Sequence, residues 1–326
     1  MRVTVLGGNS FAGGDFIDLL LGTGAHDVLA ISRSPEKTSC AYRARPRDRF
    51  AYRQLDLNRD PAEIGAALDA FGPDWVVNFA AQGELAASWA HPEDYFRTNC
   101  AALAALVDRL NRHPYVRRFL QVSTSSVYAA GGPPHTEASP PAPATPYGVS
   151  KAAFDQLLLA YHGASGFPAQ IVRPPNLYGP YQQPYRIVPK SAIALKLGGW
   201  IDLHGGGRAL KQYLHVRDAS HAMLAVLERG GTGQTYNVAP PELASVREIV
   251  GLVCERLGKD FETCTREVED RREQQAGLVI DATKIARELG WAARVPLRSG
   301  VEGVVDWVER EWEDLSGRPL VYAHQP

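Results

Sequence analysis

The chain has 326 residues, is 45% hydrophobic, and carries 35 basic and 36 acidic residues for a net charge of −1. It can bury one large core or two moderate ones, and its interspersed charges lack the basic patch that binds a phosphate backbone. The first residues read as a strand with no charged leader, and no run of 18 apolar residues occurs. We therefore expect a cytoplasmic globular protein that partners with neither nucleic acid nor membrane.

The four cysteines are widely spaced and match no CxxC or Cys/His metal-ligand spacing. We expect free thiols and no structural metal. The residues concerned are Cys40, Cys100, Cys254 and Cys264.

Short apolar runs alternate with longer helical stretches over the first 175 residues, and most are flanked by Gly, Pro or Asp. The runs are RVTVLGG, DVLAIS, FAYRQLD, DWVVNFAA, RRFLQVSTSS and PAQIVRPPN. Strands in such βαβ alternation predict a parallel sheet that is covered by helices on both faces. The expected fold class is α/β, a doubly wound parallel sheet.

The pattern loosens after Pro174, where loops and amphipathic helical stretches predict a smaller C-terminal α/β lobe. We expect part of the 213–240 segment to return to the sheet. The predicted sheet domain therefore comprises residues 1–174 and about 213–240, and the predicted lobe comprises 175–212 and about 241–326.

The first strand runs into GGNSFAGG, a glycine cluster ahead of a helical stretch. Such glycines form the tight turn, the close backbone approach to a pyrophosphate and the helix packing of a dinucleotide site. Gly7 and Gly13 fit these roles, whereas Ser10 stands where the spacing would place the middle glycine. A plain strand-to-helix turn is the alternative.

The end of the second strand discriminates between cofactors, because a carboxylate there binds a ribose hydroxyl and an Arg accommodates a 2′-phosphate. Ser32 and Arg33 supply no acid and one cation. This favours NADP over NAD, although Arg33 could also be a solvated surface residue.

Four hydroxyl residues, Ser123 to Ser126, end a buried strand, and Tyr147 and Lys151 follow at a spacing of four. Residues four apart share one helix face, so the ammonium can lie near the phenol and lower its pKa toward neutrality. A phenol tuned in this way suits a general acid or base.

The sequence resembles the extended short-chain dehydrogenase/reductases, in particular the NAD(P)-dependent nucleotide-sugar epimerases and 4,6-dehydratases. Matching pieces span almost the whole chain: LGGNSFAGG, LDL at 55–57, NFAA at 78–81, SWAHPEDYFRTN at 88–99, STSSVY, TPYGVSK, RPPNLYGPYQ, HGGG with YLHVRD, and DATKIARELGW. The resemblance implies a Rossmann domain, a nicotinamide cofactor and a lobe that closes over a nucleoside diphosphate sugar. It also implies a homodimer formed through the helix after Asn99 and the helix opened by Tyr147.

The resemblance assigns roles to individual residues. Tyr147 would be the acid/base, Lys151 would hold the nicotinamide ribose, and Thr124 would bond the sugar hydroxyl, with Ser125 and Ser126 beside it. The implied cofactor-binding residues are Gly7, Ser10, Phe11, Gly13, Ser32, Arg33, Asp56, Leu57, Ala80, Ala81, Tyr147, Lys151 and Pro174. The implied substrate residues are Ser88, Thr124, Asn176, Arg186, Lys190, His204, Lys211 and Arg271.

The substrate positions depart from the family pattern. Lys211 stands where relatives carry an Arg that grips the diphosphate, and a second family Arg aligns with Ala276, so its role could pass to Arg271 or Arg272. Several of the assigned polar residues could equally be solvated surface residues.

The residues that follow Thr124 discriminate between the possible activities. The 4,6-dehydratases resembled here carry one or two acids after the threonine, whereas this chain has Ser125 and Ser126. A serine hydroxyl is neutral at pH 7 and cannot replace a carboxylate acid or base, so a 4-epimerase is the favoured activity. A 4,6-dehydratase with another acid, a 4-reductase and a non-catalytic NAD(P)-binding sensor are the alternatives, and serines that merely cap a loop are a further interpretation of this tip.

Overall fold

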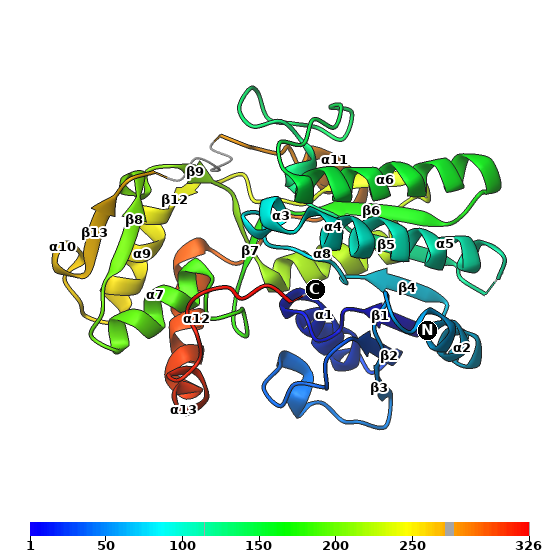
Figure 1. Cartoon of the computed structure of the whole chain (residues 1–326), viewed down its shortest axis with the longest axis horizontal. Coiled ribbons are helices and arrows are strands. Elements are labelled where there is room, and N and C mark those ends of the chain that lie inside the picture. The colour runs from blue at the N-terminus through cyan, green and yellow to red at the C-terminus, as the bar shows by residue number, and fades with distance from the viewer. Residues whose placement is uncertain (114, 271–276, 326) are drawn as a thin grey trace.

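The computed structural model describes residues 1–113, 115–270 and 277–325, and a seven-stranded sheet of these residues forms its centre (Figure 1). All neighbouring strands are parallel, in the order β11-β6-β5-β4-β1-β2-β3. The strands are β1 (Arg2–Leu6), β2 (Asp27–Ser32), β3 (Phe50–Gln54), β4 (Trp75–Asn78), β5 (Arg118–Val122), β6 (Ala169–Arg173) and β11 (Gln234–Asn237).

Both faces of the sheet are covered because its strands are apolar on both sides. In β1, Val3 and Val5 pack with one core cluster, whereas Leu6 packs with the cluster on the other face. The first cluster receives side chains from α1 (Phe11–Gly22), α8 (Val216–Arg229) and α11 (Thr283–Leu289). The second receives them from α2 (Pro61–Phe71), α5 (Leu103–Asn111) and α6 (Pro146–Ser165).

The chain reverses its direction of travel across the sheet between β1 and β4. It proceeds from β1 outward to β2 and β3, and then returns to place β4 on the other side of β1. In open parallel sheets the crevice for ligands forms at the carboxyl ends of the strands at such a reversal.

Most of the remaining helices and strands form the second lobe (Figure 1). Its core packs α7 (Ile187–Lys196), α9 (Val246–Arg256) and α12 (Leu297–Arg310) together. Three strand pairs accompany them: β7 (Asn176–Tyr178) with β10 (Tyr213–His215), β8 (Ile201–His204) with β13 (Thr265–Val268), and β9 (Leu210–Lys211) with β12 (Ala244–Ser245). The short helices α10 (Phe261–Cys264) and α13 (Trp312–Leu315) also belong to this lobe, whereas α3 (Ala87–Ala90) and α4 (Pro92–Phe96) lie beside α6 of the sheet domain.

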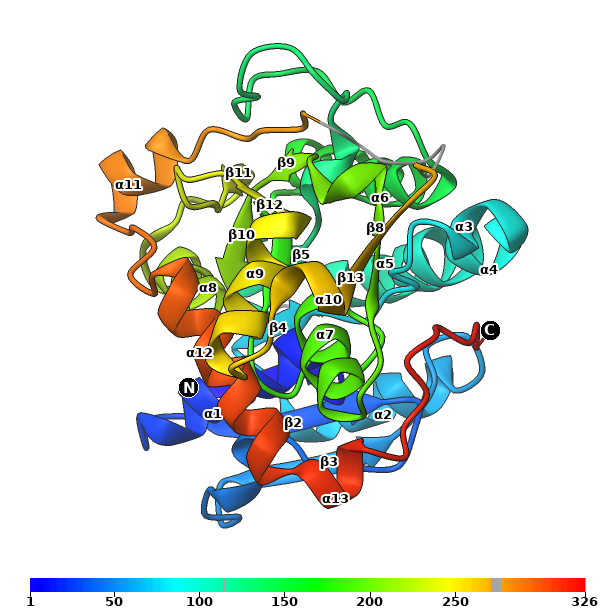
Figure 2. The ribbon, with the colours of Figure 1, turned by 90° about the vertical axis from the view of Figure 1, so that its left-hand side faces the viewer.

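The residues that follow α13 return to the sheet domain. The red trace in Figures 1 and 2 leaves α13 and ends beside that domain. There the carbonyl oxygen of Gln325 accepts hydrogen bonds from Arg33 (3.0 Å) and Gln82 (2.8 Å). We call residues 316–325 the return segment.

The predicted fold class is confirmed, and each of the six apolar runs forms a strand of the sheet. The 213–240 segment supplies the seventh strand, β11, while the exact domain boundaries stay a prediction. The four cysteines are free thiols. Among the described residues, no helix has the length and apolar character that crossing a membrane requires.

Candidate active site

One large cleft opens where the carboxyl ends of the strands face the second lobe. It is lined by the turn after β1, the ends of β4 and β5, the start of α6, and residues of β7, α7 and β8. Most of the predicted site residues lie on its walls: Ser10, Phe11, Arg33, Ala81, Thr124, Ser125, Ser126, Tyr147, Lys151, Pro174, Asn176, Arg186, Lys190, His204 and Lys211.

The turn between β1 and α1 is built for close packing. Gly7 has a φ of +78°, and a Cβ there would lie 2.6 Å from the backbone nitrogen of Ala80. Ser10 caps α1 by accepting a hydrogen bond from the Gly13 N–H (3.0 Å). The serine therefore serves as an N-cap at the position where the spacing calls for a glycine, and the N-terminus of α1 opens on the cleft.

The two predicted cofactor residues at the end of β2 differ in whether they reach the cleft. Ser32 is buried, and its Oγ accepts from the Asn9 N–H (2.9 Å), so this hydroxyl braces the turn and does not line the cleft. Arg33 is exposed and lines the cleft, where it donates to the carbonyl of Gln325.

Thr124 caps the short helical turn that follows β5. Its Oγ1 accepts a hydrogen bond from the Ser126 N–H (3.2 Å), so its own hydroxyl proton can point to another acceptor. The Ser125 N–H donates to the Pro174 carbonyl (2.9 Å). The hydroxyl residues are therefore held in place by the backbone of the strand tip.

A glycine brings α6 against the tip of β5. Thr145 caps α6 by accepting from the Gly148 N–H (3.1 Å), and Pro146 occupies its first turn. A Cβ at Gly148 would lie 2.4 Å from the Ser126 carbonyl oxygen, a separation that no side chain tolerates. Tyr147, in the first turn of α6, lies near enough to Thr124 for that hydroxyl to lower its pKa.

Opposing influences act on the pKa of Tyr147. Burial raises the pKa of Tyr147, and the hydrogen bond from Thr124 and the charge of Arg186 partly oppose this rise. The Nζ of Lys151 donates to the Val122 carbonyl (2.8 Å). The predicted lowering of the Tyr147 pKa by Lys151 stays a prediction.

Lys151 itself is strongly perturbed. It is 2% exposed, and burial lowers its pKa to about 8, against the opposing effect of Asp155. Burial also raises the pKa of Asp155, one helical turn further along α6, and the nearby Arg173 opposes that rise. Lys151 therefore loses its proton at a pH not far above neutrality.

A chain of buried polar groups supports this helix from behind. Asp155 accepts from the hydroxyl of Ser123 (2.9 Å) and from Nε of Arg173 (3.0 Å). Arg173 also donates to the hydroxyl of Tyr128 (2.7 Å), which donates to Asn237 on β11 (3.0 Å). These bonds fix the side-chain positions, although the other carboxylate oxygen of Asp155, Oδ1, accepts no hydrogen bond from the described residues.

The opposite wall carries an ion pair that the sequence analysis missed. Glu84, after β4, lies 2.9 Å from the guanidinium of Arg186, which stacks over the ring of Tyr185 (5.5 Å). Tyr185 in turn packs edge-on against Tyr322 of the return segment (5.3 Å between ring centres). Because these residues come from separate parts of the chain, no local sequence pattern joins them.

Several predicted residues lie away from the cleft walls. The Ser88 hydroxyl is buried and donates to the Leu85 carbonyl (2.6 Å), Asp56 accepts from the Asn58 N–H (2.7 Å), and Leu57 packs into a core cluster. These three side chains do not line the cleft, and their predicted roles stay predictions. Gly7, Gly13 and Ala80 act through backbone packing, and Arg271 lies outside the described residues.

Comparison with known proteins agrees with this geometry. The model of the NAD dependent epimerase/dehydratase family matches residues 3–239. The chain belongs to this family. The resemblance inferred from the sequence is confirmed, as is the type of enzyme that it implied.

Individual relatives match over nearly their full length. A dTDP-glucose 4,6-dehydratase of Streptomyces griseus is 34% identical, covering 96% of this chain and 97% of that protein. The structure of DesIV, a dTDP-glucose 4,6-dehydratase from Streptomyces venezuelae with NAD and TYD bound, is similar with a TM-score of 0.89 and 29% identity over 96% of this chain and 98% of that one. The UDP-glucose 4-epimerase of Thermus thermophilus in complex with NAD has a TM-score of 0.83 and 25% identity, over 95% and 99% of the two chains.

Proposed function

We propose that the protein is an NAD(P)-dependent 4-epimerase of a nucleoside diphosphate sugar, acting through a transient 4-ketone. The observation that supports this proposal most directly is the set of side chains that follow β5. There Thr124 and Tyr147 both line the cleft, with Thr124 near enough to lower the pKa of Tyr147, and the next two side chains, Ser125 and Ser126, are neutral hydroxyls.

The residues of the cleft fit a nicotinamide dinucleotide. The N-terminus of α1 and the tight turn at Gly7 would accommodate its pyrophosphate, and Lys151 at the base of the cleft would hold its nicotinamide ribose. When bound, such a group accepts a hydride and returns it. We favour NADP over NAD because β2 ends in Ser32 and Arg33 without a carboxylate.

Tyr147 is the proposed proton-transferring group. When hydride leaves C4 of the sugar, the C4 hydroxyl must lose its proton. When hydride returns to the other face of C4, the oxygen must regain a proton. The hydrogen bond from Thr124 and the charge of Arg186 both favour the phenolate that takes this proton. Thr124 can also orient the sugar hydroxyl toward the phenol.

A 4,6-dehydratase is the second candidate, favoured by the dehydratase relatives and by one carboxylate in the cleft. Glu84 lines the cleft and lies close enough to affect the pKa of Tyr147. Dehydration needs a base for the C5 proton and an acid for the departing C6 hydroxyl. We rank this function second because the two residues after Thr124 are serines and Glu84 is already paired with Arg186 at 2.9 Å.

Isotope labelling distinguishes the two functions. The purified enzyme is incubated with dTDP-glucose and with UDP-glucose in deuterated water, and the products are identified by NMR and mass spectrometry. We expect a C4 epimer that carries no deuterium at C5. A stable 4-keto-6-deoxy sugar, or deuterium at C5, would establish the dehydratase function, and Glu84→Gln would then abolish that product.

Two further parts of the proposal concern assembly and location. We propose a homodimer that pairs α6 and the helical stretch after Asn99, supported by an apolar groove between these elements that is lined by Phe96, Cys100, Ala101, Ala104, Ala153, Phe154 and Leu157. We also keep the cytoplasm as the expected compartment. Sedimentation velocity of the purified protein tests the dimer.

A further inference from the structure

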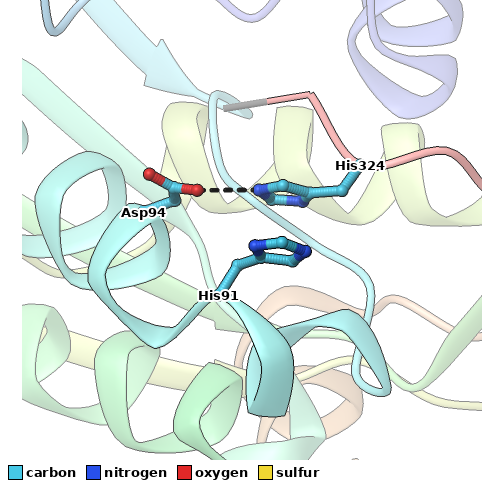
Figure 3. A group of neighbouring side chains, drawn as sticks. All are labelled: His91, Asp94 and His324. Atoms are coloured by element: carbon cyan, nitrogen blue, oxygen red, sulfur yellow. Dashed lines mark hydrogen bonds and ion pairs between the residues drawn. The ribbon is translucent and has the colours of Figure 1, made fainter.

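Two histidines and an aspartate from distant parts of the sequence meet at one place on the surface of the sheet domain (Figure 3). His91 and Asp94 lie at the start of α4, and His324 comes from the return segment. One ligand atom from each residue lies within 4.8 Å of the others. Asp94 and His324 are also joined directly, with 2.8 Å between Oδ2 and Nε2.

We propose that His91, Asp94 and His324 bind a divalent transition-metal ion, with Zn²⁺ as the representative case. Two imidazoles and one carboxylate form a donor set that suits Zn²⁺ and its neighbours, whereas Mg²⁺ and Ca²⁺ prefer oxygen ligands throughout. Three protein ligands leave a fourth tetrahedral position for water.

The surroundings of His324 orient it as metal ligands are usually oriented. Its Nδ1 lies 3.3 Å from the hydroxyl of Tyr322, so Nε2 is left to face Asp94. A hydrogen bond to the second ring nitrogen is the common way in which proteins fix the tautomer and direction of a ligating histidine. The fully buried ring of Tyr95 lies parallel to the His324 ring, with 6.2 Å between the ring centres.

Binding requires two adjustments. The rings of His91 and His324 are stacked at 4.0 Å and only 4° from parallel, and Figure 3 shows a nitrogen of each ring on the side of Asp94. Because a ligating nitrogen directs its lone pair within the ring plane, two parallel rings cannot both point at one ion, but His91 is exposed and its ring can turn. The ion also replaces the proton that joins Asp94 to His324, which is released to solvent, and the two ligand atoms then separate slightly to admit it.

A metal ion at this position would fasten the return segment to α4. The same segment places Tyr322 on the wall of the active-site cleft and the Gln325 carbonyl against Arg33 and Gln82. On the other side, Tyr95 contacts the ring of Tyr147 edge-on, with 6.2 Å between centres. The proposed site is therefore one aromatic ring away from Tyr147, although its binding chemistry does not depend on the proposed sugar substrate.

Direct measurement of bound metal tests the proposal. Full-length protein without an affinity tag is treated with a chelator, dialysed against ZnCl₂ and analysed for zinc per chain. We expect one tightly bound Zn²⁺ per chain, and roughly tenfold or greater weakening in His91→Ala and in His324→Ala, since loss of an outer-shell partner alone commonly costs that much. A large excess of MgCl₂ should not displace the zinc.

His113→Ala is the matched control, because His113 also neighbours an aspartate (Asp69, 3.7 Å) but belongs to no three-residue group among the described residues. It should bind zinc as the unaltered protein does. Circular dichroism verifies that each variant is folded. The proposal is overturned if the unaltered protein retains no zinc, or if His91→Ala and His324→Ala retain as much as it does.

Discussion

The polar groups that support α6 on the sheet-domain side of the cleft are buried, whereas the ion pair that joins this domain to the second lobe is partly exposed. Lys151, Asp155 and Arg173 are at most 3% exposed, and Asp155 accepts a hydrogen bond from Arg173. In the ion pair between the lobes, the side chain of Arg186 is 36% exposed and that of Glu84 is 22% exposed. A rigid wall suits chemistry that is common to a family, and a solvated wall can change with the substrate.

The first way to test this contrast is to remove a single hydroxyl from the rigid wall. Tyr147→Phe should retain the fold and lower kcat by about 10²- to 10⁴-fold, the usual contribution of a general acid or base. Turnover of the identified nucleotide sugar measures the effect. Near-normal turnover would remove Tyr147 from the mechanism and favour the non-catalytic sensor.

The second test breaks the buried network itself. Asp155→Ala leaves the buried Arg173 without its ion-pair partner, which should lower the free energy of unfolding by about 3–5 kcal/mol. Asp314→Ala breaks an ion pair with Arg318 whose side chains are 44% and 41% exposed, and it should cost less than about 1 kcal/mol. Urea unfolding of both variants gives the two values, and similar losses would contradict the proposed difference between buried and exposed pairs.

The third test uses pH. The pKa of Lys151 is lowered to about 8, so its ammonium is present below that pH and is lost as the pH rises through it. If the charge is needed to bind the dinucleotide, kcat/KM should fall by about tenfold for each pH unit above 8, because kcat/KM reports groups of the free enzyme. The exposed Lys259→Met should leave the profile unchanged. A flat profile up to about pH 9.5 would show that this ammonium is not required.

The smallest expected effect is a change in cofactor preference when the exposed Arg33 is replaced. Arg33→Asp replaces the cation by an acid that would repel a 2′-phosphate, so the ratio of NADP to NAD affinity should fall by about tenfold. Fluorescence titration with the two reduced dinucleotides gives this ratio. Tighter binding of NAD than NADP by the unaltered protein, by tenfold or more, would contradict the NADP preference.

The parts that could be predicted from sequence are those encoded by neighbouring residues. Six strands were recognisable because each is a short apolar run between Gly, Pro or Asp, and the spacing of Tyr147 and Lys151 placed them on one helix face. The direction of the Lys151 side chain was not encoded in that spacing, because its acceptor is a carbonyl on β5.

The parts that could not be predicted depend on contacts across the fold. Glu84 of the sheet domain meets Arg186 only after the two lobes have packed, and Tyr322 meets Tyr185 only after the return segment has taken its place. The expectation of no metal followed from cysteine spacing, whereas the site proposed above joins His91 to a residue 233 positions later in the chain (324 − 91). Ser88 lies within a matching motif, and its hydroxyl makes a local backbone contact that the motif alone does not indicate.

The position of β11 constrains how this enzyme can be made or divided. This strand pairs with β6, whose five residues are all buried, yet about 60 residues separate the two in the chain. The ribosome must therefore synthesise residues 175–212 of the second lobe before β11 can complete the sheet. Pairing between strands so far apart in the chain slows folding. A fragment that stops near residue 175 would leave β6 as a bare apolar edge, which is a template for aggregation. The dinucleotide-binding half should consequently not be obtainable as an isolated, well-behaved domain by simple truncation.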